Sequence, residues 1–180
     1  MQLYINLVTI HPIIMAIIQF ALLGTCGELI SNWIKIKKIY WPFSIWQLLY
    51  KAFSWGILAV CIKYAFVGFN GFVDQLASDH YRLLPAICAV KGSLARAFAI
   101  SALMNLQFGP FLVLFHRLLD NLIDKNGSYK GIEKGFYSLI WFWIPAHTIT
   151  FILPKEFQIL LAAIWSLFLG IILGFYNQKK

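Results

Sequence analysis

Charged residues are scarce in this chain of 180 amino acids, where Asp, Glu, Lys and Arg together make up 12% of the sequence. A soluble globular domain carries about 25% charged residues. Here 61% of the residues are apolar and the mean hydropathy is +0.74, which leaves too few polar side chains to cover a water-facing surface. This scarcity excludes a soluble domain and a disordered chain, and it predicts an integral membrane protein.

Cysteine is also scarce, with three residues at Cys26, Cys61 and Cys88. The number is odd and no Cys-x-x-Cys pair occurs, which excludes a disulfide scaffold and gives no support to a zinc or thiol redox site. Each cysteine lies in or beside an apolar stretch, where a thiol behaves as a small hydrophobic group.

Sequence motifs that carry enzyme chemistry are missing as well. The chain has no Gly-x-Ser-x-Gly, no His-Glu-x-x-His, no Gly-x-x-x-x-Gly-Lys and no paired metal-ligand spacing. We therefore expect no catalytic residue, no metal, no cofactor and no enzymatic activity. A membrane-embedded enzyme using His116, Asp120 and His147 is a second alternative, because His116 and Asp120 lie one helical turn apart, as a proton relay can use.

Basic residues outnumber acidic residues by 15 to 7, which gives a formal net charge of +8. They stand between apolar stretches and do not line one face, as at Lys35, Lys37 and Lys38. This pattern favours anchoring to anionic lipid headgroups over binding to nucleic acid. The lipid bilayer is therefore the expected partner, and no nucleic acid is expected.

A helix needs about 20 mainly apolar residues to cross a bilayer. The apolar stretches predict four firm transmembrane helices, at about 10–32, 46–75, 92–121 and 155–176. Pro110 is expected to kink the third of these helices. The segment 135–153 contains an aromatic cluster and Pro145 and is closed by Pro154, which fits an interfacial or broken helix as well as a full span. The predicted fold is all-α, a polytopic transmembrane helical bundle forming a single domain over 1–180.

Polar side chains inside these spans are costly to place in a bilayer, so they indicate contact with a partner or a wet cavity. Helical spacing places them on stripes, one stripe to each of the first three spans. The candidate pathway-lining residues are Glu28, Lys63, Asn70, Asp74, Asn105, His116 and Asp120. In one interpretation the stripes line a narrow polar pathway, with Lys63 balanced by one of the carboxylates of Glu28, Asp74 or Asp120. In the other, they only make interhelical hydrogen bonds that hold the bundle together.

Small residues recur every four positions in the last predicted helix, at Ala162, Ser166, Gly170 and Gly174. Such a ridge allows another helix to approach backbone to backbone. We expect it to pack a helix of the same chain or to form a homo-oligomer.

Several short motifs occur in an order that resembles a known family. The first are His11-Pro12, then Gln19, then Gly27-Glu28-Leu29-Ile30-Ser31-Asn32. They are followed by Gly68-Phe69 with Val73-Asp74, and near the C-terminus by Trp143, His147, Thr150-Phe151, Pro154, Ile164-Trp165-Ser166 and Leu169-Gly170. In this order they resemble the Mpv-seventeen and peroxisomal membrane protein two family, which consists of small four-span organelle membrane proteins.

The resemblance implies a four-span fold and a channel-like role for small solutes or ions. It also implies a mitochondrial inner or peroxisomal membrane, or the bacterial inner membrane for a prokaryotic member. The chain departs from the family pattern at Lys63-Tyr64, at Met104-Asn105, at His147 and at Thr150. The departures affect polar residues that would line a pathway, so they bear on any shared selectivity.

Two hypotheses for function lead the others. In the first, the chain forms a narrow channel-like pathway for small solutes or ions. In the alternative, it is a structural or assembly protein of the membrane without transport activity, in which the polar stripes and the small-residue ridge only hold helices together.

Overall fold

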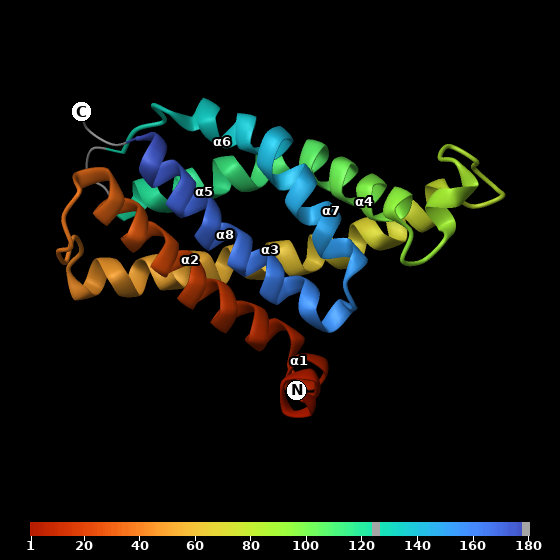
Figure 1. The fold of residues 1–180 in the computed structure, drawn as a ribbon, viewed down its shortest axis with the longest axis horizontal. Coiled ribbons are helices and arrows are strands. Elements are labelled where there is room, and N and C mark those ends of the chain that lie inside the picture. Colours follow the sequence, from red (N-terminus) through yellow and green to blue (C-terminus); the bar gives the residue numbers. More distant parts are fainter. Residues whose placement is uncertain (124–126, 178–180) are drawn as a thin grey trace.

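Helices make up the secondary structure of the computed structural model, which describes residues 1–123 and 127–177 and has no strand in that part. In chain order the elements are α1 (Gln2–Ile10), α2 (Pro12–Ile36), α3 (Ile45–Leu76), η1 (Ala86–Ala89), α4 (Leu94–Gln107), α5 (Gly109–Ile123), α6 (Ile132–Ser138), η2 (Leu139–Trp143), α7 (Ile144–Ile152) and α8 (Lys155–Tyr176). The predicted helical bundle is confirmed (Figure 1).

Three helices, α2, α3 and α8, are long and apolar enough to cross a membrane. The 22 residues of α8 extend about 33 Å at 1.5 Å per residue, which matches a hydrocarbon layer of about 30 Å. Large apolar side chains such as Leu22 and Phe53 are exposed on the outside, as lipid contact requires. These features are those of an integral membrane protein.

Residues with known capping preferences stand at the ends of α2 and at the start of α3. Pro12 opens α2, where a missing N–H costs nothing, and Lys37 ends it in the left-handed conformation. Ser44 begins α3 with a capping box, because its hydroxyl accepts from the Gln47 N–H while the Gln47 side chain accepts from the Ser44 N–H.

The predicted third span over 92–121 is not one straight helix. It is divided into α4 and α5, which are bent by 49° where they meet. Pro110 explains the position of the bend, because its ring cannot donate a backbone hydrogen bond and crowds the preceding turn. Four firm spans are therefore not confirmed, since a fourth exists only if this bent pair counts as one broken span.

The segment predicted to be ambiguous, 135–153, lies in a helical run made of α6, η2 and α7. Its middle, η2, is a π-helical turn. Pro145 follows directly in the first turn of α7, where a widened turn relieves the loss of its N–H. The segment is therefore helical with a π-helical turn in its middle, and the choice between an interfacial helix, a broken helix and a full span stays a prediction.

The most extensive helix–helix contact joins α2 and α8, which cross side by side (Figure 1). A Cβ atom added at Gly170 would lie 2.7 Å from the Gly27 carbonyl oxygen, and one at Gly174 would lie 3.0 Å from the Ser31 backbone. Ala162 and Ser166 are buried on the same face of α8. The small-residue ridge is therefore occupied by α2 of the same chain.

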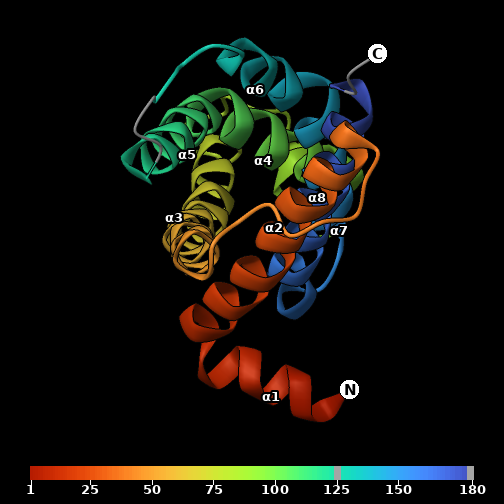
Figure 2. The ribbon, with the colours of Figure 1, turned by 90° about the vertical axis from the view of Figure 1, so that its left-hand side faces the viewer.

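The elements leave two different ends along the long axis of the molecule. The C-terminal ends of α2, α5 and α8 gather at one end, and the C-terminal end of α3, η1 and the start of α4 gather at the other (Figure 1). The short α1 stands off the bundle (Figure 2). It is tied back by Tyr4, whose hydroxyl donates to the Glu156 carbonyl oxygen at 3.1 Å and accepts from the Gln19 amide at 3.1 Å.

Candidate functional site

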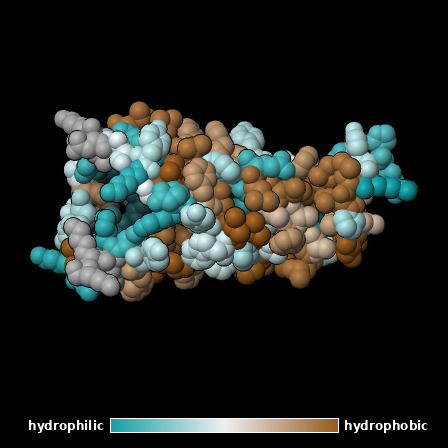
Figure 3. All heavy atoms as spheres, turned by 90° about the horizontal axis from the view of Figure 1, so that it is seen from above, coloured by the Kyte–Doolittle hydropathy of each residue, from teal (hydrophilic) through white to brown (hydrophobic). Residues whose placement is uncertain are grey.

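A cavity of about 410 Å³ lies inside the bundle between α2, α3, α5 and α8, with α6 and η2 along one side. Its lining begins with charged and polar residues near the C-terminal ends of α2, α5 and α8. It ends at buried residues of α4 and α7. On the face drawn in Figure 3, hydrophilic residues gather at both ends of the molecule, and the surface is hollowed among those at the left-hand end. The cavity has the size and the enclosure of a small-molecule site.

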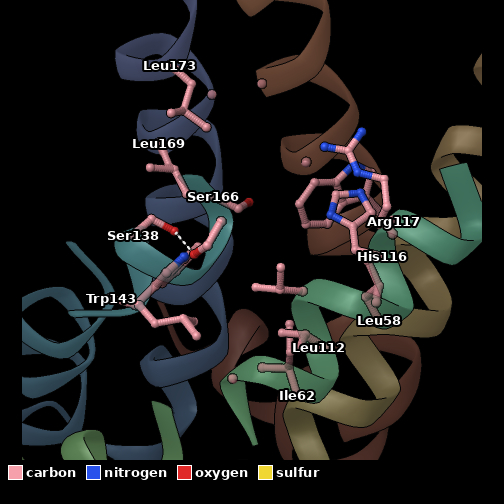
Figure 4. Close-up of a pocket in the computed structure, with 18 of the residues that line it drawn as sticks. Leu58, Ile62, Leu112, His116, Arg117, Ser138, Trp143, Ser166, Leu169 and Leu173 are labelled. Carbon is pink, nitrogen blue, oxygen red and sulfur yellow. Dashed lines mark hydrogen bonds between the residues drawn. The ribbon is translucent and has the colours of Figure 1, made fainter. Parts of the chain in front are cut away.

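The middle of the cavity is apolar. Leu58 and Ile62 of α3, Leu112 of α5 and Leu169 of α8 line it, and Figure 4 shows the two walls that these helices form. Apolar walls of this kind do not hold water well. The charged side chains of the lining lie at the mouth, while Ser138 and Ser166 add hydroxyl groups to the wall beyond it (Figure 4).

At the mouth, Glu28 of α2 is held by two residues of α3. Its carboxylate makes a short ion pair with the Lys51 ammonium and accepts a hydrogen bond from the Trp55 ring nitrogen at 2.8 Å. Trp55 packs over Gly24, where a Cβ atom would lie 2.3 Å from the ring. The missing side chain of Gly24 thus lets Trp55 reach Glu28.

His116 and Asp120 of α5 complete this mouth cluster of Glu28, Lys51, Trp55, His116 and Asp120. The Nε2 atom of His116 lies 3.7 Å from Glu28 Oε1 and 3.8 Å from Asp120 Oδ2, and Lys51 Nζ lies 3.8 Å from Asp120 Oδ1. His116 Nε2 is buried and has no hydrogen-bond partner in the described residues. The cluster therefore joins three helices by charge and leaves one ring nitrogen unpaired.

The side chains of Glu28, His116 and Asp120 present ligand atoms within 4.8 Å of one another, as a metal site would. The Lys51 ammonium already pairs with Glu28 and lies near Asp120. A metal ion would have to displace Lys51 and leave its charge without a partner, at a high cost inside a membrane. The chemistry of this group therefore fits an ion-pair cluster better than a metal centre.

The floor of the cavity is formed by Asn105 and His147, which are 3% and 7% exposed. The Asn105 side-chain nitrogen lies 3.1 Å from His147 Nδ1 and donates to the Ser101 carbonyl oxygen at 2.8 Å. Trp143 stacks on the His147 ring at 4.9 Å, and Phe66 meets it edge-on at 5.4 Å. These contacts fix the orientation of both polar side chains.

A second polar cluster lies at the opposite end of the molecule, outside the lining of the 410 Å³ cavity. Arg96 of α4 makes a short ion pair with Asp74 of α3. Its guanidinium also donates to the carbonyl oxygens of Cys88 and Asn70, each at 3.3 Å. The Arg96 side chain is 8% exposed, so it fastens the loop around η1 onto α3 and α4.

The structure separates the residues that the sequence grouped as one pathway. Glu28, Asn105, His116 and Asp120 line the cavity. Asn70 and Asp74 belong to the Arg96 cluster, and Lys63 lies on a part of α3 outside the cavity lining. The three carboxylates predicted to balance Lys63 are all near other cations.

Sequence reasoning missed Lys51 and Trp55 as parts of the mouth cluster, and it missed the pairing of Arg96 with Asp74. Lys51 carries a signal that could have found it, because a lysine inside a predicted span indicates a buried partner. His147 was considered for an enzyme but not as a cavity floor.

No protein-family model, no curated protein and no solved structure matches this chain. The resemblance of its motifs to the Mpv-seventeen and peroxisomal membrane protein two family stays a prediction.

Proposed function

We propose that this membrane protein gives small solutes a channel-like pathway through the cavity between α2, α3, α5 and α8. The observation that carries the proposal is the cavity itself, with a charged mouth and a buried polar floor inside a bundle of membrane-spanning length. Enclosed cavities with a few fixed polar groups are the usual form of solute sites in helical proteins.

The backbone around the floor supports a pathway over a purely structural role. The bend between α4 and α5 and the π-helical turn η2 both contribute lining residues, among them Phe108, Gly109 and Leu139. Interrupted helices inside a membrane protein are tolerated where they line a cavity, and solute sites of transporters use them.

The predicted relation to the Mpv-seventeen and peroxisomal membrane protein two family agrees with this proposal, because channel-like activity is what that resemblance implies. It would place the protein in the mitochondrial inner or peroxisomal membrane, or in the inner membrane of a bacterium. The functional proposal does not depend on this relation, since the cavity supports it independently.

The test is solute flux in liposomes that contain the purified protein, measured with glycerol and erythritol as probes. Leu112→Trp fills the middle of the cavity and should reduce flux at least tenfold. Lys63→Ala is the matched control outside the cavity and should leave flux unchanged. Tight vesicles with folded wild-type protein would overturn the proposal in favour of a structural membrane protein, and so would flux that Leu112→Trp does not reduce.

A second measurement tests access from the mouth. In a protein whose three native cysteines are replaced, single cysteines are placed at Leu173, Leu169 and Ser166, which follow α8 inward (Figure 4). A membrane-impermeant thiol reagent should label Leu173→Cys fastest and Ser166→Cys slowest. Equal labelling of all three, or labelling that starts at Ser166→Cys, would contradict a pathway that begins at the charged mouth.

A further inference from the structure

We propose that the solute of this cavity is a single-chain anionic amphiphile with a neutral hydrogen-bonding group, such as a hydroxyl, at its far end. The inference rests on the proposed function, because it names the substrate class of the same cavity. Three properties of the cavity carry it: its shape, the apolar character of its middle, and the different polar groups at its two ends.

The cavity is long. α5 rises about 16 Å between Gly109 near the floor and Asp120 at the mouth, at 1.5 Å per residue. A cavity of this length with a volume of about 410 Å³ has room for one extended alkyl chain.

The apolar middle excludes a hydrated ion as the preferred occupant. An ion between Leu58, Ile62 and Leu112 would lose its water and gain no polar contact in exchange. A methylene chain in the same place removes apolar surface from water at about 25 cal/mol for each Å² buried. The walls therefore favour a molecule with an apolar body.

Among the described residues, the lining of the mouth carries two basic side chains, Arg117 and Lys134, beside the carboxylates of Glu28 and Asp120. Lys51 lies outside this lining and pairs with Glu28 near Asp120, and no ion pair in the described residues joins Arg117 or Lys134 to either carboxylate. Lys134 Nζ donates to the Asn177 side chain at 2.6 Å, which holds its charge at the rim. An anionic headgroup such as a carboxylate is favoured here, because both basic side chains can donate hydrogen bonds to it.

The floor offers one donor and one acceptor. Since the Asn105 amide donates to His147 Nδ1, the proton of the neutral ring is assigned to Nε2. In the described residues neither His147 Nε2 nor Asn105 Oδ1 has a hydrogen-bond partner, and both side chains line the cavity. A terminal methyl group would leave this donor and acceptor unpaired, whereas a hydroxyl group pairs with both.

The experiment measures equilibrium binding of radiolabelled ω-hydroxydodecanoate to the protein in nanodiscs, with empty nanodiscs subtracted. Unlabelled dodecanoate and dodecanediol compete, because the first lacks the terminal hydroxyl and the second lacks the anionic head. We expect each competitor to bind about tenfold more weakly than ω-hydroxydodecanoate, which is the effect of one lost hydrogen bond or headgroup contact. Equal affinity of the three compounds would overturn the inference.

Variants locate the binding. His147→Phe should abolish the preference for the hydroxylated chain and retain dodecanoate binding, and Arg117→Gln with Lys134→Gln should abolish the preference for the carboxylate. Leu112→Trp should remove binding of every chain, and Lys63→Ala should change none of these values. If His147→Phe does not fold, the competition of dodecanoate with ω-hydroxydodecanoate in the wild-type protein still tests the preference for a terminal hydroxyl group. Binding that persists unchanged in Leu112→Trp contradicts the inference.

The two proposals fail in different ways. Tight vesicles together with selective binding of ω-hydroxydodecanoate would overturn the pathway and leave the ligand class standing. Flux that Leu112→Trp reduces, without selective chain binding, would leave the pathway standing and overturn the ligand class.

Discussion

The mouth cluster around Glu28 and the cluster around Arg96 are built from similar residues but have different roles. At one end of α3, Lys51 pairs with Glu28 beside a cavity, and His116 keeps an unpaired ring nitrogen. At the other end, Arg96 pairs with Asp74, and its further donors go to backbone carbonyl oxygens. A polar group with all its partners in place stabilises packing, whereas unpaired groups that face a cavity are available to a solute.

The largest loss of stability is expected at the contact between the backbones of α2 and α8, which form one wall of the cavity. Gly170→Leu places a side chain against the Gly27 carbonyl group, 2.7 Å from the position of its Cβ atom. Neither backbone can yield, so we expect separation of α2 from α8 and loss of more than about 3 kcal/mol of stability. Thermal unfolding in detergent, followed by circular dichroism, measures it.

Gly68→Leu is the matched control for this change, because nothing lies within 4 Å of a Cβ atom added there. It should unfold within a few degrees of the wild-type protein. A similar loss of stability in both glycine variants would show that the α2–α8 contact is not special.

Arg96→Met tests the closed end and should have the next largest effect. It removes a buried cation that holds Asp74 and two backbone carbonyl groups, at an expected cost of about 3 kcal/mol. Because Arg96 lies away from the cavity, flux per folded protein should stay unchanged. Stability is measured by thermal unfolding and flux in liposomes, and a variant that stays stable but loses flux would make this end part of the pathway.

Lys51→Met and its control Lys63→Met compare two lysines of the same helix. The loss of stability in Lys51→Met should be smaller than in Gly170→Leu and in Arg96→Met. Lys51→Met leaves Glu28 with Trp55 and His116 as its neighbours, at a cost of about 2 kcal/mol. Lys63→Met should cost less than about 0.5 kcal/mol, since Lys63 makes no ion pair in the described residues. Denaturant titration of both variants measures the difference, and equal losses would refute the assignment of Lys51 to the cluster.

Much of the helical layout could be predicted from local patterns. The apolar runs place α3 and α8 close to their observed bounds, and Pro110 marks the bend between α4 and α5. The sequence pattern did not predict that the third span would be divided into two helices. A proline marks where a helix bends, but it does not specify the angle of the bend. The π-helical turn before Pro145 likewise has no sequence period of its own.

The choice of lysine shows why the site could be predicted only in part. Lys51 and Lys63 lie on the same helix but about 120° apart around its axis, at 100° per residue. Sequence spacing grouped Lys63 with Asn70 and Asp74, as a common stripe. It did not show that α5 faces Lys51 and that α4 faces Asp74, because this depends on helices distant in the chain.

Apolar helices of membrane-spanning length and the ridge of small residues on α8 follow from local sequence, because composition and periodicity are properties of each helix alone. The packing of the helices adds what local sequence does not contain: α2 occupies this ridge, Lys51 meets Glu28, Arg96 meets Asp74, and a cavity ends at Asn105 and His147. Ion pairs and cavities arise from the crossing and rotation of helices against one another, which no single stretch of sequence contains.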